Sequence, residues 1–76
     1  MNPPAPVPLL STTLASAIYD SQQRVLQIEF RSGAIYQYFD VPENTYQELL
    51  TADSYGTYFN RNIRDAFAYL LVRPAP

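Results

Sequence analysis

Seven residues in two short stretches of the chain are of types that bind ligands. One stretch has two tyrosines separated by a single residue, and the other has small polar residues followed by two arginines: Tyr36, Tyr38, Ser54, Gly56, Thr57, Arg61 and Arg64. Tyrosine rings can stack on unpaired bases, and guanidinium groups can hold phosphates. These residue types point to a binding site for a phosphate-bearing ligand.

The arginine stretch is expected on a helix that begins after Ser54. Thr57, Arg61 and Arg64 recur at i, i+4 and i+7, which places them on one face of that helix. Near Ser54 and Gly56, backbone N–H groups at the helix start could receive an anion. In the alternative interpretation, Ser54 is only a helix cap, Gly56 allows close packing, and the arginines solvate the outer face.

The residue types that are missing exclude several kinds of site. The chain has no cysteine and no histidine, so it has no disulfide or thiolate chemistry and lacks the commonest zinc ligand and general base. No aspartate, glutamate, tyrosine or serine is arranged as a recognisable acid and base pair. We therefore expect no catalytic residue, no metal site and no cofactor, and we expect that the protein is not an enzyme.

The charge balance bears on the choice of partner. All five basic residues are arginines, and seven carboxylates give the chain a net charge of −2. Proteins that bind nucleic acid are usually basic, because their affinity comes from neutralised phosphates. Bulk electrostatics therefore do not favour a nucleic acid, and only a local arginine patch could bind one.

The chain length of 76 residues suits one small domain, which we place at residues 13–72. Residues 1–12 are rich in proline and are expected to be a flexible leader, and residues 73–76 are expected to be a similar tail. The start has no positive charge and no long apolar run, so we expect neither a secretory signal nor a membrane span. The cytoplasm is the default location, and a membrane is not an expected partner.

The hydrophobic pattern predicts an α+β fold. Residues 25–30 alternate between apolar and polar side chains, as in a half-buried strand, and proline or serine signals mark two helix starts, at Pro42 and Ser54. The predicted order is βββαα, a small antiparallel three-stranded sheet followed by two helices packed on one face. The three strands are expected at residues 17–19, 25–30 and 35–39, and residues 67–72 are expected to return as a short strand or an irregular segment.

Two registers are open for the hairpin of residues 25–39. A two-residue loop would place Ile28 opposite Gln37, and both tyrosines would then point away from the apolar face. A three-residue loop that ends at Gly33 would instead place Ile28 opposite Tyr36.

We favour the three-residue loop, because the shorter loop buries an unpaired amide at a cost of about 1–3 kcal/mol. In the favoured register Tyr36 and Tyr38 join the core face with their hydroxyl groups near its rim. Ile35 and Phe39 then lie on the opposite face.

Two motifs in sequence order carry a family resemblance. The string L-x-I-x-F-x-S-G-x-I-Y-x-Y-x-x-V-P runs from Leu26 to Pro42, and A-x-S-x-G-x-Y-F-N-x-x-I-R runs from Ala52 to Arg64. Together they resemble the KTSC domain, a family named for its occurrence at the C-terminus of some lysyl-tRNA synthetases and also found as short single-domain bacterial proteins. The resemblance covers roughly residues 15–70, and it implies a role as an accessory RNA-binding domain.

Two classes of binding function follow from the sequence. The first is a weak RNA-binding module, in which arginines hold phosphates and exposed aromatic rings stack on bases. The second is a protein-interaction or oligomerisation module, in which the outward Ile35 and Phe39 contact another protein or a second copy of the chain.

Overall fold

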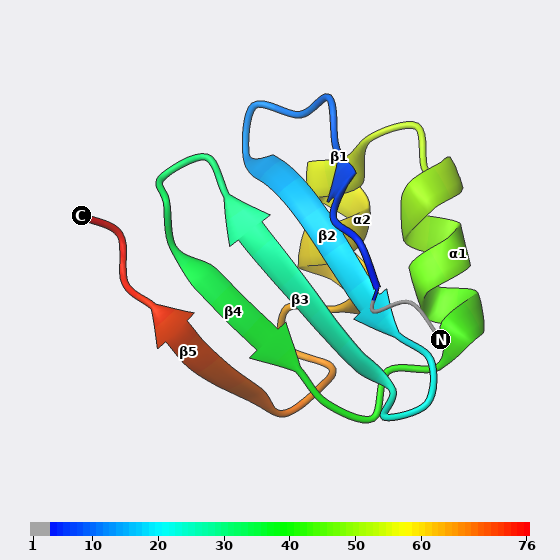
Figure 1. The fold of residues 1–76 in the computed structure, drawn as a ribbon. Coiled ribbons are helices and arrows are strands. Elements are labelled where there is room, and N and C mark those ends of the chain that lie inside the picture. Colours follow the sequence, from blue (N-terminus) through cyan, green and yellow to red (C-terminus); the bar gives the residue numbers. More distant parts are fainter. Residues whose placement is uncertain (1–3) are drawn as a thin grey trace.

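A computed structural model describes residues 4–76, within which five strands form one antiparallel sheet and two helices lie beside it (Figure 1). The sheet order is the chain order, β1-β2-β3-β4-β5. The elements are β1 (Val7–Pro8), β2 (Leu14–Asp20), β3 (Val25–Phe30), β4 (Ile35–Tyr38), α1 (Glu43–Thr51), α2 (Tyr55–Asn62) and β5 (Tyr69–Arg73). The α+β class is confirmed, whereas the expected three-stranded sheet is wrong because β1 and β5 extend it at both edges.

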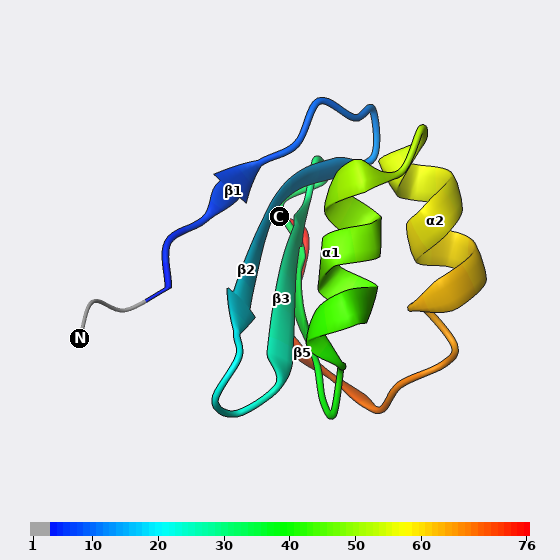
Figure 2. The same cartoon turned by 90° about the vertical axis from the view of Figure 1, so that its right-hand side faces the viewer.

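The two helices pack on one face of the sheet and cover only part of it. Figure 2 shows the sheet edge-on with α1 and α2 on the same side. In Figure 1 α2 lies behind β2 and α1 lies to the right of β1 and β2, while β4 and β5 lie on the left, away from both helices. We call the face toward the helices the inner face and the opposite one the outer face. The inner face at Tyr36 and along β5 is therefore left without a helical cover, whereas Tyr38 on β4 packs against Phe59 of α2.

The first edge strand falls inside the segment that the sequence analysis assigned to a leader. Val7 pairs with Ala17, Pro8 pairs with Ser16, and Leu9 is only 2% exposed. The domain therefore begins before residue 13, and the boundary at residue 12 needs correction; residues 1–3 of the expected leader lie outside the described residues. A two-residue strand that follows Pro6 and contains Pro8 is too short to show an alternating pattern, which is why the sequence did not reveal it.

The other end of the chain also joins the sheet. Arg73 was assigned to the tail but is the last residue of β5, and Tyr69 pairs with Tyr38 across the β4–β5 ladder. The expectation that residues 67–72 return as a short strand is confirmed for residues 69–72.

The hairpin of β3 and β4 has the register expected for a three-residue loop. Ile28 pairs with Tyr36 and Leu26 pairs with Tyr38. The loop closes where the Phe30 N–H donates to the carbonyl oxygen of Ala34 at 2.9 Å, and Gly33 has a φ of +97°, a conformation that favours glycine. Both tyrosines consequently share the inner face with the two aliphatic residues.

The core fills the space between the helices and the inner face of β2 to β4. Phe30 and Leu50 are partly buried against it. The buried residues are Leu9, Leu14, Ala17, Leu26, Ile28, Tyr38, Val41, Tyr46, Leu49, Phe59 and Ile63. Neither helix within residues 4–76 has the length and apolar character needed to cross a bilayer.

Replacement of the two glycines by alanine is expected to have opposite effects on stability. Gly33→Ala should lower the free energy of unfolding by about 1–3 kcal/mol, because a positive φ is unfavourable for a residue with a Cβ; that Cβ would also lie 2.9 Å from Cδ of Pro76. Gly56→Ala is the matched control, since its Cβ would lie 3.8 Å from the nearest atom and helix propensity favours alanine by about 0.4–1 kcal/mol. Urea unfolding of both variants measures the difference, and equal effects would contradict the assigned loop.

Candidate nucleic-acid interface

A cleft of about 660 Å³ opens where the helices leave the inner face of the sheet uncovered. Its floor and walls come from the β3–β4 hairpin, from β5, from α2 and from the loop before β2. Five aromatic residues from these elements line it, and we call it the aromatic cleft: Phe30, Tyr36, Tyr38, Phe59 and Tyr69.

The five rings form one connected cluster. Tyr36 and Tyr38 lie nearly parallel, with an interplanar angle of 28° and ring centroids 6.4 Å apart. Phe59 packs edge-on against Tyr38 at 5.5 Å, and Tyr69 lies 5.7 Å from Tyr36. Offset and edge-to-face contacts of this kind hold aromatic rings in fixed orientations. The floor of the cleft is thus a preformed aromatic surface.

The hairpin register explains why tyrosines form this floor. Residues two apart in a strand share a face, so Tyr36 and Tyr38 both follow the inner face of β4, and Tyr69 joins them from β5 as the partner of Tyr38. Burial rises from the rim inward, since Tyr69 is 61% exposed, Tyr36 is half-buried and Tyr38 is 4% exposed. Within residues 4–76 the hydroxyl groups of these three tyrosines have no hydrogen-bond partner. They are therefore available to a ligand.

The innermost tyrosine is held in its neutral form. Burial raises the pKa of Tyr38 to about 12, with smaller contributions in the same direction from Tyr36 and Tyr69. The Arg64 guanidinium acts in the opposite direction on that pKa, which shows that its positive charge lies close enough to be felt at the cleft floor. At neutral pH Tyr38 is therefore uncharged, and Arg64 lines the same cleft.

Two arginines line the cleft, and they differ in what they already bind. The Nε of Arg31 donates to the carbonyl oxygen of Ser11 at 3.0 Å, and its Nη2 donates to that of Leu9 at 2.8 Å, which holds the loop before β2 in place. Arg64 is exposed, and its guanidinium makes no hydrogen bond or ion pair with any residue of the described part of the chain. Because Asp65 is the carboxylate in the lining, two guanidinium groups face one acidic group there. The cleft is locally more basic than the chain as a whole.

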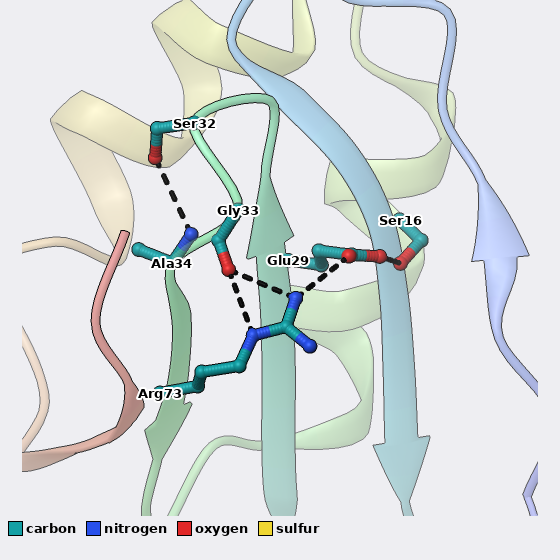
Figure 3. A network of polar contacts seen from close by, with 6 residues as sticks. All are labelled: Ser16, Glu29, Ser32, Gly33, Ala34 and Arg73. Atoms are coloured by element: carbon teal, nitrogen blue, oxygen red, sulfur yellow. Dashed lines mark hydrogen bonds and ion pairs between the residues drawn. The ribbon is translucent and has the colours of Figure 1, made fainter. Parts of the chain in front are cut away.

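Arg73 holds β5, and with it Tyr69, against the rest of the sheet. Figure 3 shows the Arg73 guanidinium reaching over the Gly33 carbonyl, to which Nη2 donates at 2.9 Å, toward Glu29 on β3. The ion pair with Glu29 spans 3.3 Å, and Ser16 on β2 donates to the same carboxylate at 3.2 Å. These contacts link three strands on the outer face. An exposed pair of this kind contributes at most about 1 kcal/mol, so its main effect is on position.

The structure separates the residues that the sequence grouped into one site. Tyr36, Tyr38 and Arg64 line the aromatic cleft, whereas the other four residues do not: Ser54, Gly56, Thr57 and Arg61. The helix ends at Asn62, so the regular spacing that placed Arg61 and Arg64 on one face does not continue to residue 64.

The start of α2 has the geometry of a capped helix. The Ser54 hydroxyl oxygen accepts from the Thr57 N–H at 3.2 Å and also lies 3.0 Å from the Thr57 hydroxyl. This contact satisfies one of the backbone donors that an anion would need. The cap interpretation of Ser54 is therefore confirmed. Ile35 and Phe39, the expected outward residues, are both half-buried.

Sequence reasoning did not place Phe30, Phe59 or Tyr69 in the site. Phe59 is a core residue and Phe30 packs against the core, and both also line the cleft. Tyr69 comes 31 residues after its strand partner Tyr38. The only feature of the sequence that could have indicated its place in the site was an aromatic residue at the start of the last strand.

A model of the KTSC domain family matches residues 10–67 of the chain. The chain belongs to the KTSC domain family. The match ends just before β5, so this last strand lies outside the range of the family model. The family resemblance read from the two motifs is confirmed.

Several proteins share this KTSC domain. An uncharacterised protein of Stutzerimonas stutzeri is 49% identical over 55 residues, which cover 72% of this chain and 78% of that protein. A lysine–tRNA ligase of Trichormus variabilis is 43% identical over 51 residues, which are 67% of this chain but only 9% of the ligase. The crystal structure of a KTSC domain protein from Yersinia pestis has a TM-score of 0.88 at 33% identity and covers 91% of this chain and 97% of that one. The domain thus occurs both as a small protein and as a small part of tRNA ligases.

The raised tyrosine pKa values predict a loss of stability in alkali. The pKa of Tyr38 is raised to about 12 by burial, and that of Tyr58 is raised to about 12 by burial and by its hydrogen bond to Glu48, 2.7 Å long. An unfolded tyrosine has a pKa of about 10. Because the folded values are higher, the stabilisation is fully present below about pH 10 and is lost as the pH rises toward about 12.

Urea unfolding at increasing pH measures this loss, and the absorbance of tyrosinate follows the titration. Tyr58→Phe should make the free energy of unfolding less dependent on pH over this range, because one of the two raised groups is gone. A stability that stays constant to about pH 12 in the parent protein would contradict the assignment.

Proposed function

We propose that this KTSC domain is a non-catalytic module that binds single-stranded RNA weakly in the aromatic cleft. Unpaired bases stack on the exposed rings of Tyr36 and Tyr69, and Arg64 holds a phosphate at the rim. Arg31 adds a second positive charge to the lining of the cleft while it keeps its contacts to the chain. The proposal includes a cytoplasmic location, where RNA is available.

The observation that carries the proposal is the unpaired guanidinium of Arg64 beside a preformed aromatic floor. An arginine with no partner within residues 4–76 leaves its donors free for a phosphate, and no protein contact must be broken when RNA binds. The tyrosines are already oriented by their neighbours, so stacking costs little conformational entropy.

The size and charge of the cleft set the expected strength of binding. A volume of about 660 Å³ is within the range of small-ligand sites and suits a few nucleotides. The net charge of −2 opposes a polyanion over the rest of the surface. We therefore expect low affinity with a contact to only one or two phosphates.

The relatives support an RNA ligand over other anions. The lysine–tRNA ligases of Trichormus variabilis and Nostoc punctiforme contain a segment that is 43% and 39% identical to this chain. A domain that forms 9% of such a protein is well suited to an accessory contact with tRNA, and single-stranded loops and ends are the parts of RNA whose bases can be stacked.

Arg61, near the end of α2, and Arg64, two residues after the helix, provide a matched pair for the test. Arg64 lines the cleft and Arg61 does not, although both are exposed. Arg64→Glu should weaken binding of labelled single-stranded RNA by about tenfold and reduce the dependence of log K on log salt by about 0.7, the value for one phosphate. Arg61→Glu changes the net charge equally and should have a much smaller effect. Fluorescence anisotropy at two salt concentrations measures both quantities.

A second variant tests stacking separately from charge. Tyr69→Ala should weaken binding by about 1–3 kcal/mol without changing the salt dependence, because the ring contributes stacking alone. Tyr69 is 61% exposed, so the fold should tolerate its loss. If the parent protein shows no binding at low salt, or if Arg61→Glu and Arg64→Glu reduce affinity equally, the cleft does not bind RNA.

A further inference from the structure

The two edges of the sheet differ in how they are protected from pairing with another strand. β1 has only two residues, and Pro8 lies within it and Pro6 before it, so this edge offers few backbone donors. β5 has five residues, all exposed, and none of them is a proline or a lysine. Apart from Arg73 and a bulge at its C-terminal end, it lacks the features that usually prevent edge-to-edge association.

β5 also carries four of the six exposed large hydrophobic residues of the described chain. Its first four residues are large and apolar, and each remains between 44% and 61% exposed: Tyr69, Leu70, Leu71 and Val72. Because side chains alternate along a strand, this apolar surface lies on both faces of the edge. A single helix or loop would cover one face only, whereas a further strand would place neighbouring side chains beside these residues on both faces.

The backbone of β5 has free hydrogen-bonding groups at this edge. The Phe39 N–H donates to the carbonyl oxygen of Ala68 at 2.9 Å, and Leu70 is paired with Gln37. In an antiparallel ladder the bonded residues alternate, so Ala68 and Leu70 bond toward β4 while Tyr69 and Leu71 point their N–H and C=O groups to the free edge. Two residues thus present two donors and two acceptors to a neighbouring strand.

We propose that β5 pairs antiparallel with β5 of a second copy of the chain, about a two-fold axis at Leu70. Tyr69 of each copy then lies opposite Leu71 of the other, and four backbone hydrogen bonds join the two strands. Leu70 faces Leu70 of the second copy across the axis, and Val72 lies opposite the second copy's Ala68. The two five-stranded sheets become one continuous sheet.

A second copy fits this edge better than a partner of different composition. The self-pairing places apolar side chains opposite apolar side chains at every position from residue 68 to residue 72. The charged residue of β5 is Arg73. The two copies of Arg73 lie at opposite ends of the paired strands, and each forms an ion pair with Glu29 of its own chain. No like charges are therefore brought together. The register shift between β4 and β5 leaves Val72 as the extra residue of a bulge on β5, which follows Leu71, the last residue of the bonded centre.

The pairing also has a consequence for the aromatic cleft. A two-fold axis between antiparallel strands of one sheet is perpendicular to that sheet, so the inner faces of both copies lie on the same side. The uncovered strands β4 and β5 of each copy become neighbours, and the two clefts share one floor between the two α2 helices. The dimer itself depends only on β5 and stands whether or not the cleft binds RNA.

The oligomeric state in the absence of RNA tests the proposal. In sedimentation velocity over a range of concentrations, the mass of the parent protein should rise from 8.7 kDa toward twice that value. Leu70→Lys places two like charges directly opposite each other and should raise the dissociation constant by about tenfold or more. Leu10→Lys is the matched control, because Leu10 is 94% exposed, lies outside β5 and should leave the dimer unchanged. A parent protein that stays at 8.7 kDa throughout, or equal effects of the two lysines, would overturn the proposal.

Amide hydrogen exchange of the parent protein gives a second test, whose result does not depend on whether a substituted protein folds. The N–H groups of Tyr69 and Leu71 should exchange more slowly as the protein concentration rises, because they are bonded only in the dimer. The N–H of Leu70 is expected to bond within its own sheet at every concentration and serves as the internal reference. Exchange at Tyr69 and Leu71 that does not respond to concentration, in a sample that has dimerised, would place the interface elsewhere.

Discussion

The register of the β3–β4 hairpin is the constraint on which both the core and the cleft depend. It is set by a three-residue loop in which Gly33 has a φ of +97° and Phe30 bonds to Ala34. A slip of one residue would move Tyr36 and Tyr38 to the outer face and bring Gln37 into the core. In the observed register that amide instead bonds to Gln27 at 3.1 Å on the opposite face. The same loop also receives Arg73, so the position of β5 follows from it as well.

The cleft exists because two short helices cover only part of a five-stranded sheet. Aliphatic residues fill the inner face where helices cover it, as at Leu14, Leu26 and Ile28. On β4 and β5 the inner face carries tyrosines, whose rings can pack against the core while their hydroxyl groups contact water. Tyr38 packs against Phe59 of α2 and is buried, whereas Tyr36 and Tyr69 lie beyond the helical cover and are partly or largely exposed. The exposed rings of Tyr36 and Tyr69 are an apolar surface that can stack on a base, while the core beneath them stays filled.

Two residues of the same type and similar spacing in the sequence can have different surroundings in the fold. Arg61 and Arg64 are three positions apart and were grouped on one helix face, but α2 ends at Asn62. Beyond that point the helical spacing no longer applies, and only Arg64 reaches the cleft. The two edges of the sheet also differ, although prolines occur near both. The edge strand β1 has two residues and contains a proline, whereas the edge strand β5 has five residues, four of them apolar, and contains none.

The sequence by itself determined the local features of this protein. The alternation of residues 25–30, the glycine at position 33 and the serine cap at position 54 predicted the central hairpin, its register and the start of α2, because each depends on neighbours within a few residues. The two motifs likewise identified the family. Only the tertiary structure decided that β1 and β5 complete the sheet, since their pairing partners lie 10 and 31 residues away and their own patterns are short. It alone decided the site, because the cleft is formed where segments distant in sequence meet, and no spacing along the chain encodes that Phe30, Phe59 and Tyr69 surround the same space.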